Sequence, residues 1–196
     1  MSTAADALHE IWRLGGGDPA ALPRVSLAGD DPVLPSTFRV GAFAQATIAA
    51  AGLAAAEIWR LRTGRAQRVA VDMRAAAIEF RSERYLRVTS IDTPPMWDPI
   101  AGVYRTGDGR FVRLHTNFPH HRRAVVSLLG ASDTRESVQE KLAGWKGEDF
   151  ETAAAGAGAV AAMMRSPEEW AAHPQGRALA ALPAFEIERI GDAAPR

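Results

Sequence analysis

An uncharged segment, residues 40–56, constrains the fold of this chain more than any other feature, because alanine occupies most of its positions. A helix with small residues on nearly all of its sides can be packed by neighbours on nearly all sides. We therefore expect residues 41–63 to form a long buried helix. Gly64 should end it, because glycine readily adopts the left-handed conformation found after helix ends. Residues 67–73 then alternate between apolar and polar side chains, which predicts a strand next to this helix.

The composition is that of an ordinary globular protein without a bias toward charged partners. Hydrophobic residues make up 47% of the chain, and its 23 basic residues balance 23 acidic ones. A chain without net charge has no overall field to attract DNA, RNA or an anionic membrane, so no nucleic-acid partner is expected. The absence of cysteine excludes disulfides, thiolate metal sites and a cysteine nucleophile, and it agrees with a cytoplasmic location.

The uncharged segment 40–56 is also the part of the chain to weigh as a membrane span. It contains Gln45, Thr47 and two glycines, and alanine contributes little transfer energy. A span needs about 20 strongly apolar residues, so we expect a core helix and no membrane insertion. Residues 1–14 carry charges scattered among apolar residues, which does not match a signal peptide.

The rest of the chain predicts short helices and one β-hairpin. Two β-rich segments, 102–106 and 110–114, flank a Gly-Asp-Gly turn, which is typical of a hairpin. Residues 18–37 are rich in proline, glycine and aspartate and are expected to form a long loop. The other predicted elements are helices over 4–14, 74–88, 118–129 and 133–143, a mostly helical segment over 148–164 with a break at Gly156 and Gly158, a helix that starts at Ser166-Pro167, and a strand over 184–190.

Three motifs, in this order along the chain, resemble those of the class III CoA-transferases, also called the CaiB/BaiF type. They are Leu61–Met73, Gly102–Gly109 and Arg165–Gln175. The family includes formyl-CoA transferase, carnitine CoA-transferase and α-methylacyl-CoA racemase. The resemblance covers about residues 36–190 and lacks the family's N-terminal, nucleotide-binding-like half. It implies a partial class III CoA-transferase fold, with a long buried helix, a strand and a helix, followed by a small domain with a β-hairpin and helices.

The fold class expected from the elements and the resemblance together is α/β to α+β, mostly helical. Four segments are predicted. Residues 1–35 form an N-terminal helix and a Pro/Gly-rich linker, and residues 36–95 form the helix–strand–helix part of the large domain. Residues 96–190 form the small α+β domain, and residues 191–196 form a tail or linker.

The resemblance also implies where a reactive carboxylate belongs. In the family, an aspartate just before the long helix attacks the acyl-CoA thioester and forms an acyl anhydride. In the racemases it pairs with a histidine from the missing half to move a proton. Counting back from Thr63-Gly64 puts this position at Gly41-Ala42, so Ala42 replaces the aspartate. Asp30 and Asp31, on the preceding loop, are the candidates for a substitute carboxylate, and ordinary turn residues are the alternative.

Other side chains are weighed for the same chemistry. Glu57 lies well inside the long helix and is expected to pair with Arg60 or Arg62. The resemblance places Met73 near the thiol end of bound coenzyme A, with plain strand packing as the alternative. Arg65 is a candidate for a phosphate contact, with a solvated turn as the alternative.

A metal site is not expected from the histidines of this chain. His120 and His121 are adjacent and would point about 100° apart on a helix, so they do not chelate as an i, i+4 pair would. His115 would lie at the end of a strand, and no carboxylate falls at ligand spacing.

The sequence leaves two functions open. The first is a part or subunit of a class III CoA-transferase, or of an acyl-CoA racemase as the second choice. Such a protein would take coenzyme A or acyl-CoA as substrate and would not be active alone, because Ala42 stands at the aspartate position. The second is a catalytically silent structural or regulatory partner. Either way, we expect a homodimer or a second chain that carries the missing N-terminal half.

Overall fold

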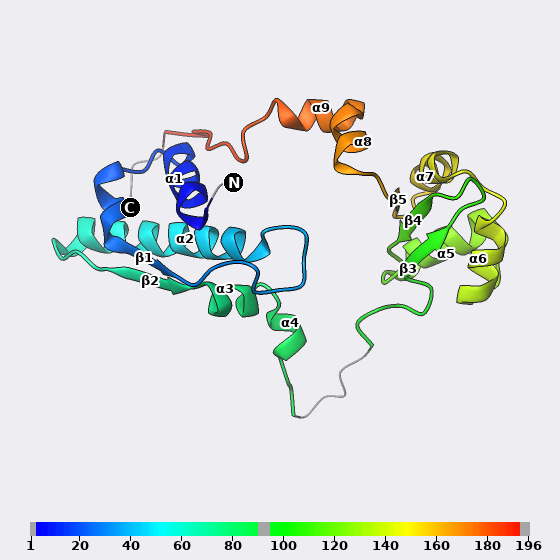
Figure 1. Cartoon of the computed structure of the whole chain (residues 1–196), viewed down its shortest axis with the longest axis horizontal. Coiled ribbons are helices and arrows are strands. Elements are labelled where there is room, and N and C mark those ends of the chain that lie inside the picture. Colours follow the sequence, from blue (N-terminus) through cyan, green and yellow to red (C-terminus); the bar gives the residue numbers. More distant parts are fainter. Residues whose placement is uncertain (1–2, 90–94, 193–196) are drawn as a thin grey trace. The chain divides into compact units, whose positions relative to one another are not determined.

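The structure is a computed structural model that describes residues 3–89 and 95–192. The chain divides into two compact units. The first comprises Met1–Arg87 and Ala180–Arg196, and the second comprises Val88–Leu179 (Figure 1). The predicted N-terminal helix and linker therefore fold into the same unit as the long helix.

The first unit is built around one long helix, α2. Its elements are α1 (Ala4–Leu14), a 3-10 helix η1 (Pro19–Arg24), β1 (Val25–Ala28), α2 (Val40–Thr63), β2 (Val69–Asp72), α3 (Met73–Glu79) and α4 (Ser82–Tyr85). Helix α1 begins with a capping box, in which the Thr3 hydroxyl accepts from the Asp6 N–H and the Asp6 carboxylate accepts from the Thr3 N–H. This cap sets the start of an amphipathic helix that buries Leu8 and Trp12.

Helix α2 confirms the predicted buried helix. Its small residues Ala44, Ala46 and Ala49 have no exposed surface, and Gly64 ends the helix at φ 73°. By length and composition alone α2 could also cross a membrane, but half of its most apolar stretch is already buried inside the protein. This is the behaviour of a core helix.

Strands β1 and β2 form a parallel pair along α2 (Figure 1). The register runs from Val25 opposite Val69 to Ala28 opposite Asp72. The predicted strand is confirmed as β2, but the prediction of one long loop over 18–37 is wrong, because η1 and β1 lie in it. The sequence of β1 has little pattern that would predict a strand. These residues form one because β2, more than forty residues later, supplies their hydrogen bonds.

The second unit packs helices on one face of a small antiparallel sheet (Figure 1). Its elements are β3 (Gly102–Arg105), β4 (Phe111–Leu114), α5 (Pro119–Leu129), α6 (Arg135–Leu142), α7 (Gly147–Gly156), β5 (Ala161–Met163), α8 (Pro167–Ala172) and α9 (Pro174–Ala180). The strand order is β3-β4-β5, so the predicted hairpin is confirmed as β3 and β4. Tyr104 and Val112 from the sheet meet Val125, Leu142 and Phe150 from the helices in one core.

Three predictions of local structure are wrong. The break expected at Gly156 is confirmed, but the residues after it form β5 and not more helix, because they pair with β4. The helix expected over 74–88 is split into α3 and α4, which are separated at Phe80 and Arg81. Residues 184–190 form no strand. In each case the local pattern was short or rich in alanine, and such patterns do not separate helix from strand or loop.

Candidate functional site

The candidate site lies where β1 and β2 end beside the first turns of α2. Gln45 of α2 is only 1% exposed, and its side-chain amide reaches both strands. Its Nε2 donates to the carbonyl oxygens of Ala28 and Val71, at 2.8 Å each. One buried side chain thus fixes the helix against the carboxyl ends of both parallel strands, which is the edge where open α/β sheets usually bind ligands.

A carboxylate from the loop after β1 lies on the first turn of α2. The backbone N–H of Ala42 donates to Oδ2 of Asp31 at 2.8 Å. A helix begins with N–H groups that have no partner within the helix, and the positive end of its dipole favours an anion there. Asp31 therefore caps α2 from outside the helix, while Arg39 at the N-cap position makes no side-chain cap hydrogen bond.

The backbone at this point is tightly packed. A Cβ placed on Gly41 would collide with Oδ1 of Asp31 and would lie 2.9 Å from the Met73 sulfur. Glycine at this position lets the loop carboxylate and the methionine approach the helix together. Met73 is 4% exposed and follows the end of β2 directly. Ala42, the residue at the expected aspartate position, is 5% exposed, so its methyl group is buried.

A cleft of about 190 Å³ lies beside these groups. Its lining includes Asp30, Asp31, Gln45 and Met73, together with Thr3 at the start of α1. The two candidate carboxylates and the candidate methionine therefore border the same hollow. This arrangement holds a carboxylate, a thioether and an amide on a rigid frame of helix and strands, which is a suitable frame for positioning a polar ligand.

Arg65 and Glu57 lie away from this group. Helix α2 has 24 residues, or about 36 Å at 1.5 Å per residue, and Arg65 follows its far end. Glu57 accepts from Nε of Arg60 at 2.9 Å and is also bonded to Arg24, as an ion-pair residue would be. Burial alone would raise the pKa of Glu57, but the hydrogen bonds from Arg60 and Arg24 outweigh it, and the pKa is lowered.

Gln45 is the residue of the site that sequence reasoning missed. In the sequence it serves only as an argument against a membrane span. A single amide inside a long uncharged helix is itself a signal, because a buried polar side chain needs hydrogen-bond partners. Its partners, however, are the carbonyl groups of two strands that only the fold brings together.

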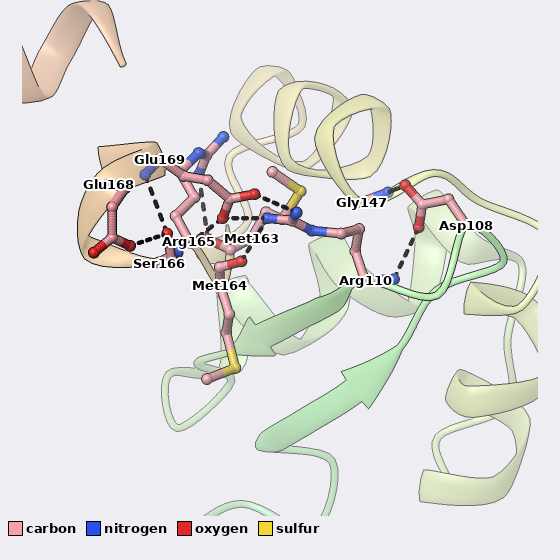
Figure 2. Close-up of polar contacts among 9 residues, drawn as sticks. All are labelled: Asp108, Arg110, Gly147, Met163, Met164, Arg165, Ser166, Glu168 and Glu169. Carbon is pink, nitrogen blue, oxygen red and sulfur yellow. Dashed lines mark hydrogen bonds and ion pairs between the residues drawn. The ribbon is translucent and has the colours of Figure 1, made fainter. Parts of the chain in front are cut away.

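Figure 2 shows a second polar cluster, in the second unit, which joins the start of α8 to the sheet. Arg110 donates to Oε2 of Glu169 at 2.8 Å and to the carbonyl oxygen of Met164 at 3.1 Å. Ser166 and Glu169 form the capping box expected for this helix. The hydrogen bond from Arg110, followed by that from the Ser166 N–H, lowers the pKa of Glu169 to about 2.

The hairpin motif is held by its own aspartate. Asp108 accepts from the Thr106 hydroxyl at 2.6 Å. It also accepts from the Gly147 N–H at 3.1 Å (Figure 2). The hydrogen bond from Thr106 is the main reason that the pKa of Asp108 is lowered. Since all of these partners belong to the second unit, Asp108 ties the β3–β4 turn to the start of α7, and its role is structural.

The histidines gather at the start of α5. The ring centroids of His120 and His121 are 4.0 Å apart, and His115 and His121 both lie near the Phe118 ring. Nδ1 of His121 is buried without a hydrogen-bond partner. Burial and the two neighbouring histidines lower the pKa of His121. Within residues 3–89 and 95–192, no group of three or more His, Asp or Glu side chains is placed to hold a metal ion.

Comparison with known proteins gives one family and one fold. Residues 22–189 match the family model described as CoA-transferase family III. Hypothetical protein Rv3272 from Mycobacterium tuberculosis is similar in structure, with a TM-score of 0.62 and 16% identity over 86% of this chain and 62% of that one. Its orthorhombic crystal form gives a TM-score of 0.60 and 17% identity over 98% of this chain and 57% of that one.

A CaiB/BaiF family protein from Brucella suis has a TM-score of 0.51 and 15% identity, over 89% of this chain and 65% of that one. At such identities the likeness shows the fold. The chain spans less than two thirds of the length of these relatives. No curated protein sequence matches it. The family and the partial fold inferred from the three motifs are confirmed.

Proposed function

Because the chain belongs to CoA-transferase family III, we propose that it is a part or subunit of an enzyme that handles acyl-CoA thioesters. Transfer of coenzyme A between carboxylic acids is the first choice of reaction, and racemisation of an acyl-CoA is the second. Coenzyme A or its thioester is the substrate in either case. The observation that carries the proposal is the family match over residues 22–189, which includes the helix, strand and hairpin of the three motifs.

The chain is not active alone. The family reaction needs a carboxylate that attacks the thioester carbonyl, and the buried methyl group of Ala42 stands at that position. Asp31 is close, but its Oδ2 already accepts the Ala42 N–H as a helix cap. The carboxylate that attacks the thioester is therefore supplied by another part of the assembly.

A partner with a nucleotide-binding-like lobe covers the open side of the first unit. Strands β1 and β2 form a sheet of two parallel strands, and parallel sheets are normally covered on both faces. Large apolar residues of this unit are also exposed: Phe38, Phe43, Ile58, Trp59, Leu61, Ile78 and Phe80. A second chain with this lobe, a further segment with it, or a second copy of the chain would bury them. The assembly is cytoplasmic.

A catalytically silent partner is the second candidate function. The buried Ala42 favours it, because a scaffold that only supports another subunit has no need of the carboxylate. The two candidates differ in whether the chain binds thioesters. They agree that it functions within an assembly.

Calorimetry with coenzyme A and short acyl-CoAs separates the two candidates. Saturable binding by the purified chain, or transferase activity restored by adding a polypeptide with the nucleotide-binding-like half, supports the enzyme part. Absence of binding and turnover, together with a stable homodimer in light scattering, supports the silent partner. Appreciable transfer of coenzyme A by the purified chain alone would contradict both.

A further inference from the structure

A second hollow, distinct from the cleft at Asp31, lies between the loop after β1 and helices α3 and α4. Its volume is about 510 Å³, within the range of roughly 300–1,000 Å³ that is usual for small-molecule sites. Pro32, Val33 and Leu34 line it from the loop. Ala77, Ile78 and Tyr85 line it from the two helices, which lie close to this loop in Figure 1.

One charged residue lies among these apolar walls. Arg74, in the first turn of α3, is the only charged member of the lining. Among residues 3–89 and 95–192 it has no ion-pair or hydrogen-bond partner for its side chain. The nearest acidic residue along the chain, Asp72, instead caps α3 through the Ala75 N–H at 2.9 Å. The guanidinium is therefore available to an anion that enters the hollow.

We propose that this pocket binds a small aliphatic carboxylate, with its carboxylate on Arg74 and its hydrocarbon chain along Val33, Ala77 and Ile78. A guanidinium matches a carboxylate with two parallel hydrogen bonds, and the apolar walls favour an alkyl chain over water. A single cation suits one carboxylate and not a polyphosphate. The lining has no acidic side chain that would bind a metal or an amine.

Two residues that line the pocket are direct neighbours in sequence of residues of the candidate site described above. Pro32 directly follows Asp31, and Arg74 directly follows Met73. A carboxylic acid in this pocket would therefore lie beside the loop that caps α2. The acid is a substrate or product only if the proposed function holds, but its binding rests on the pocket alone.

The test is a chemical-shift titration of the ¹⁵N-labelled chain with butanoate, hexanoate and the uncharged hexan-1-ol. Each buried methylene should strengthen binding about fourfold, so hexanoate should bind about tenfold or more tightly than butanoate. Hexanol, without the charge, should bind at least tenfold more weakly than hexanoate. Resonances of residues 32–34 and 74–85 should shift.

Two pairs of variants at exposed positions identify the contacts. Arg74→Gln should weaken hexanoate binding at least tenfold, whereas Arg68→Gln, which removes an exposed cation outside the pocket, should leave it unchanged. Ile78→Glu should abolish binding by placing a negative charge in the pocket, and Ile78→Gln should weaken it much less. Circular dichroism verifies that each variant is folded.

The proposal is overturned if hexanoate does not bind, if Arg74→Gln binds it as well as the unchanged chain, or if hexanol competes equally. These results are independent of the calorimetry with coenzyme A. Hexanoate binding with neither coenzyme A binding nor restored transferase activity would keep the pocket and contradict the thioester function. The reverse result would keep the thioester function and remove the pocket.

Discussion

Replacing Gln45 by leucine tests the frame that holds the candidate site. The substitution keeps a similar volume and helix propensity but removes the two hydrogen bonds that join α2 to the ends of β1 and β2. Each such bond contributes about 1 kcal/mol net, and a buried carbonyl without a donor costs about 1–3 kcal/mol. Leucine gains part of this back through apolar contacts. We expect a net loss of about 3 kcal/mol in the free energy of unfolding.

Urea unfolding followed by tryptophan fluorescence measures this loss. Trp12 and Trp59 belong to the first unit and Trp97, Trp145 and Trp170 to the second, so selective replacement of either set by phenylalanine assigns the transition to a unit. Gln67→Leu, at an exposed position before β2, is the matched control and should change stability by less than about 0.5 kcal/mol.

Gln45→Glu tests whether the side chain of residue 45 must donate its hydrogen bonds to the two carbonyl oxygens. An ionised carboxylate would face two carbonyl oxygens, while the neutral acid can still donate to one of them, so the pKa of the new group should be raised in the folded state. A raised folded pKa means that the relative stability of this variant is greatest below about pH 4.3 and falls as the pH rises. The hydrogen-bond explanation is refuted if Gln45→Leu unfolds at the same urea concentration as the unchanged chain, or if Gln67→Leu is equally harmful.

Three further predictions concern the second unit. The pKa of Glu169 is lowered to about 2, so its contribution to stability is present above about pH 4.5 and lost toward pH 2. The unfolding temperatures of Glu169→Gln and of the unchanged chain should therefore become equal as the pH falls through this range. The lowered pKa of His121 means that folding favours its neutral form, so stability should fall below about pH 6.5, and His121→Phe should reduce that fall in the same measurement. Gly107→Ala should destabilise the unit by about 1–3 kcal/mol in urea unfolding, because its Cβ would collide with the carbonyl oxygen of Ala143, whereas Gly156→Ala, whose Cβ meets nothing, should not.

Local patterns determined much of the first unit and the hairpin of the second. The alanine-rich run and Gly64 predicted α2 and its end, because helix packing and a left-handed terminal residue are visible in consecutive positions. The alternation before Met73 predicted β2 for the same reason. The motifs around these elements were also sufficient to identify the family.

Tertiary structure decided the strands that depend on distant partners. Strand β1 exists because β2 pairs with it, and β5 exists because β4 does, and neither segment carries a pattern that separates it from loop or helix. Closing such long loops costs conformational entropy, which is recovered only when the whole unit forms. A short stretch of sequence therefore cannot reveal that β1 or β5 is a strand.

The candidate site divides in the same way. The sequence by itself predicted that Ala42 stands at the aspartate position and that Asp30, Asp31 and Met73 are the groups to consider. Only the fold decided that the Asp31 carboxylate caps the helix at Ala42 and that Gln45 joins three elements. Residue types and spacing are properties of the chain, whereas a hydrogen bond between separate elements depends on the path of the backbone between them.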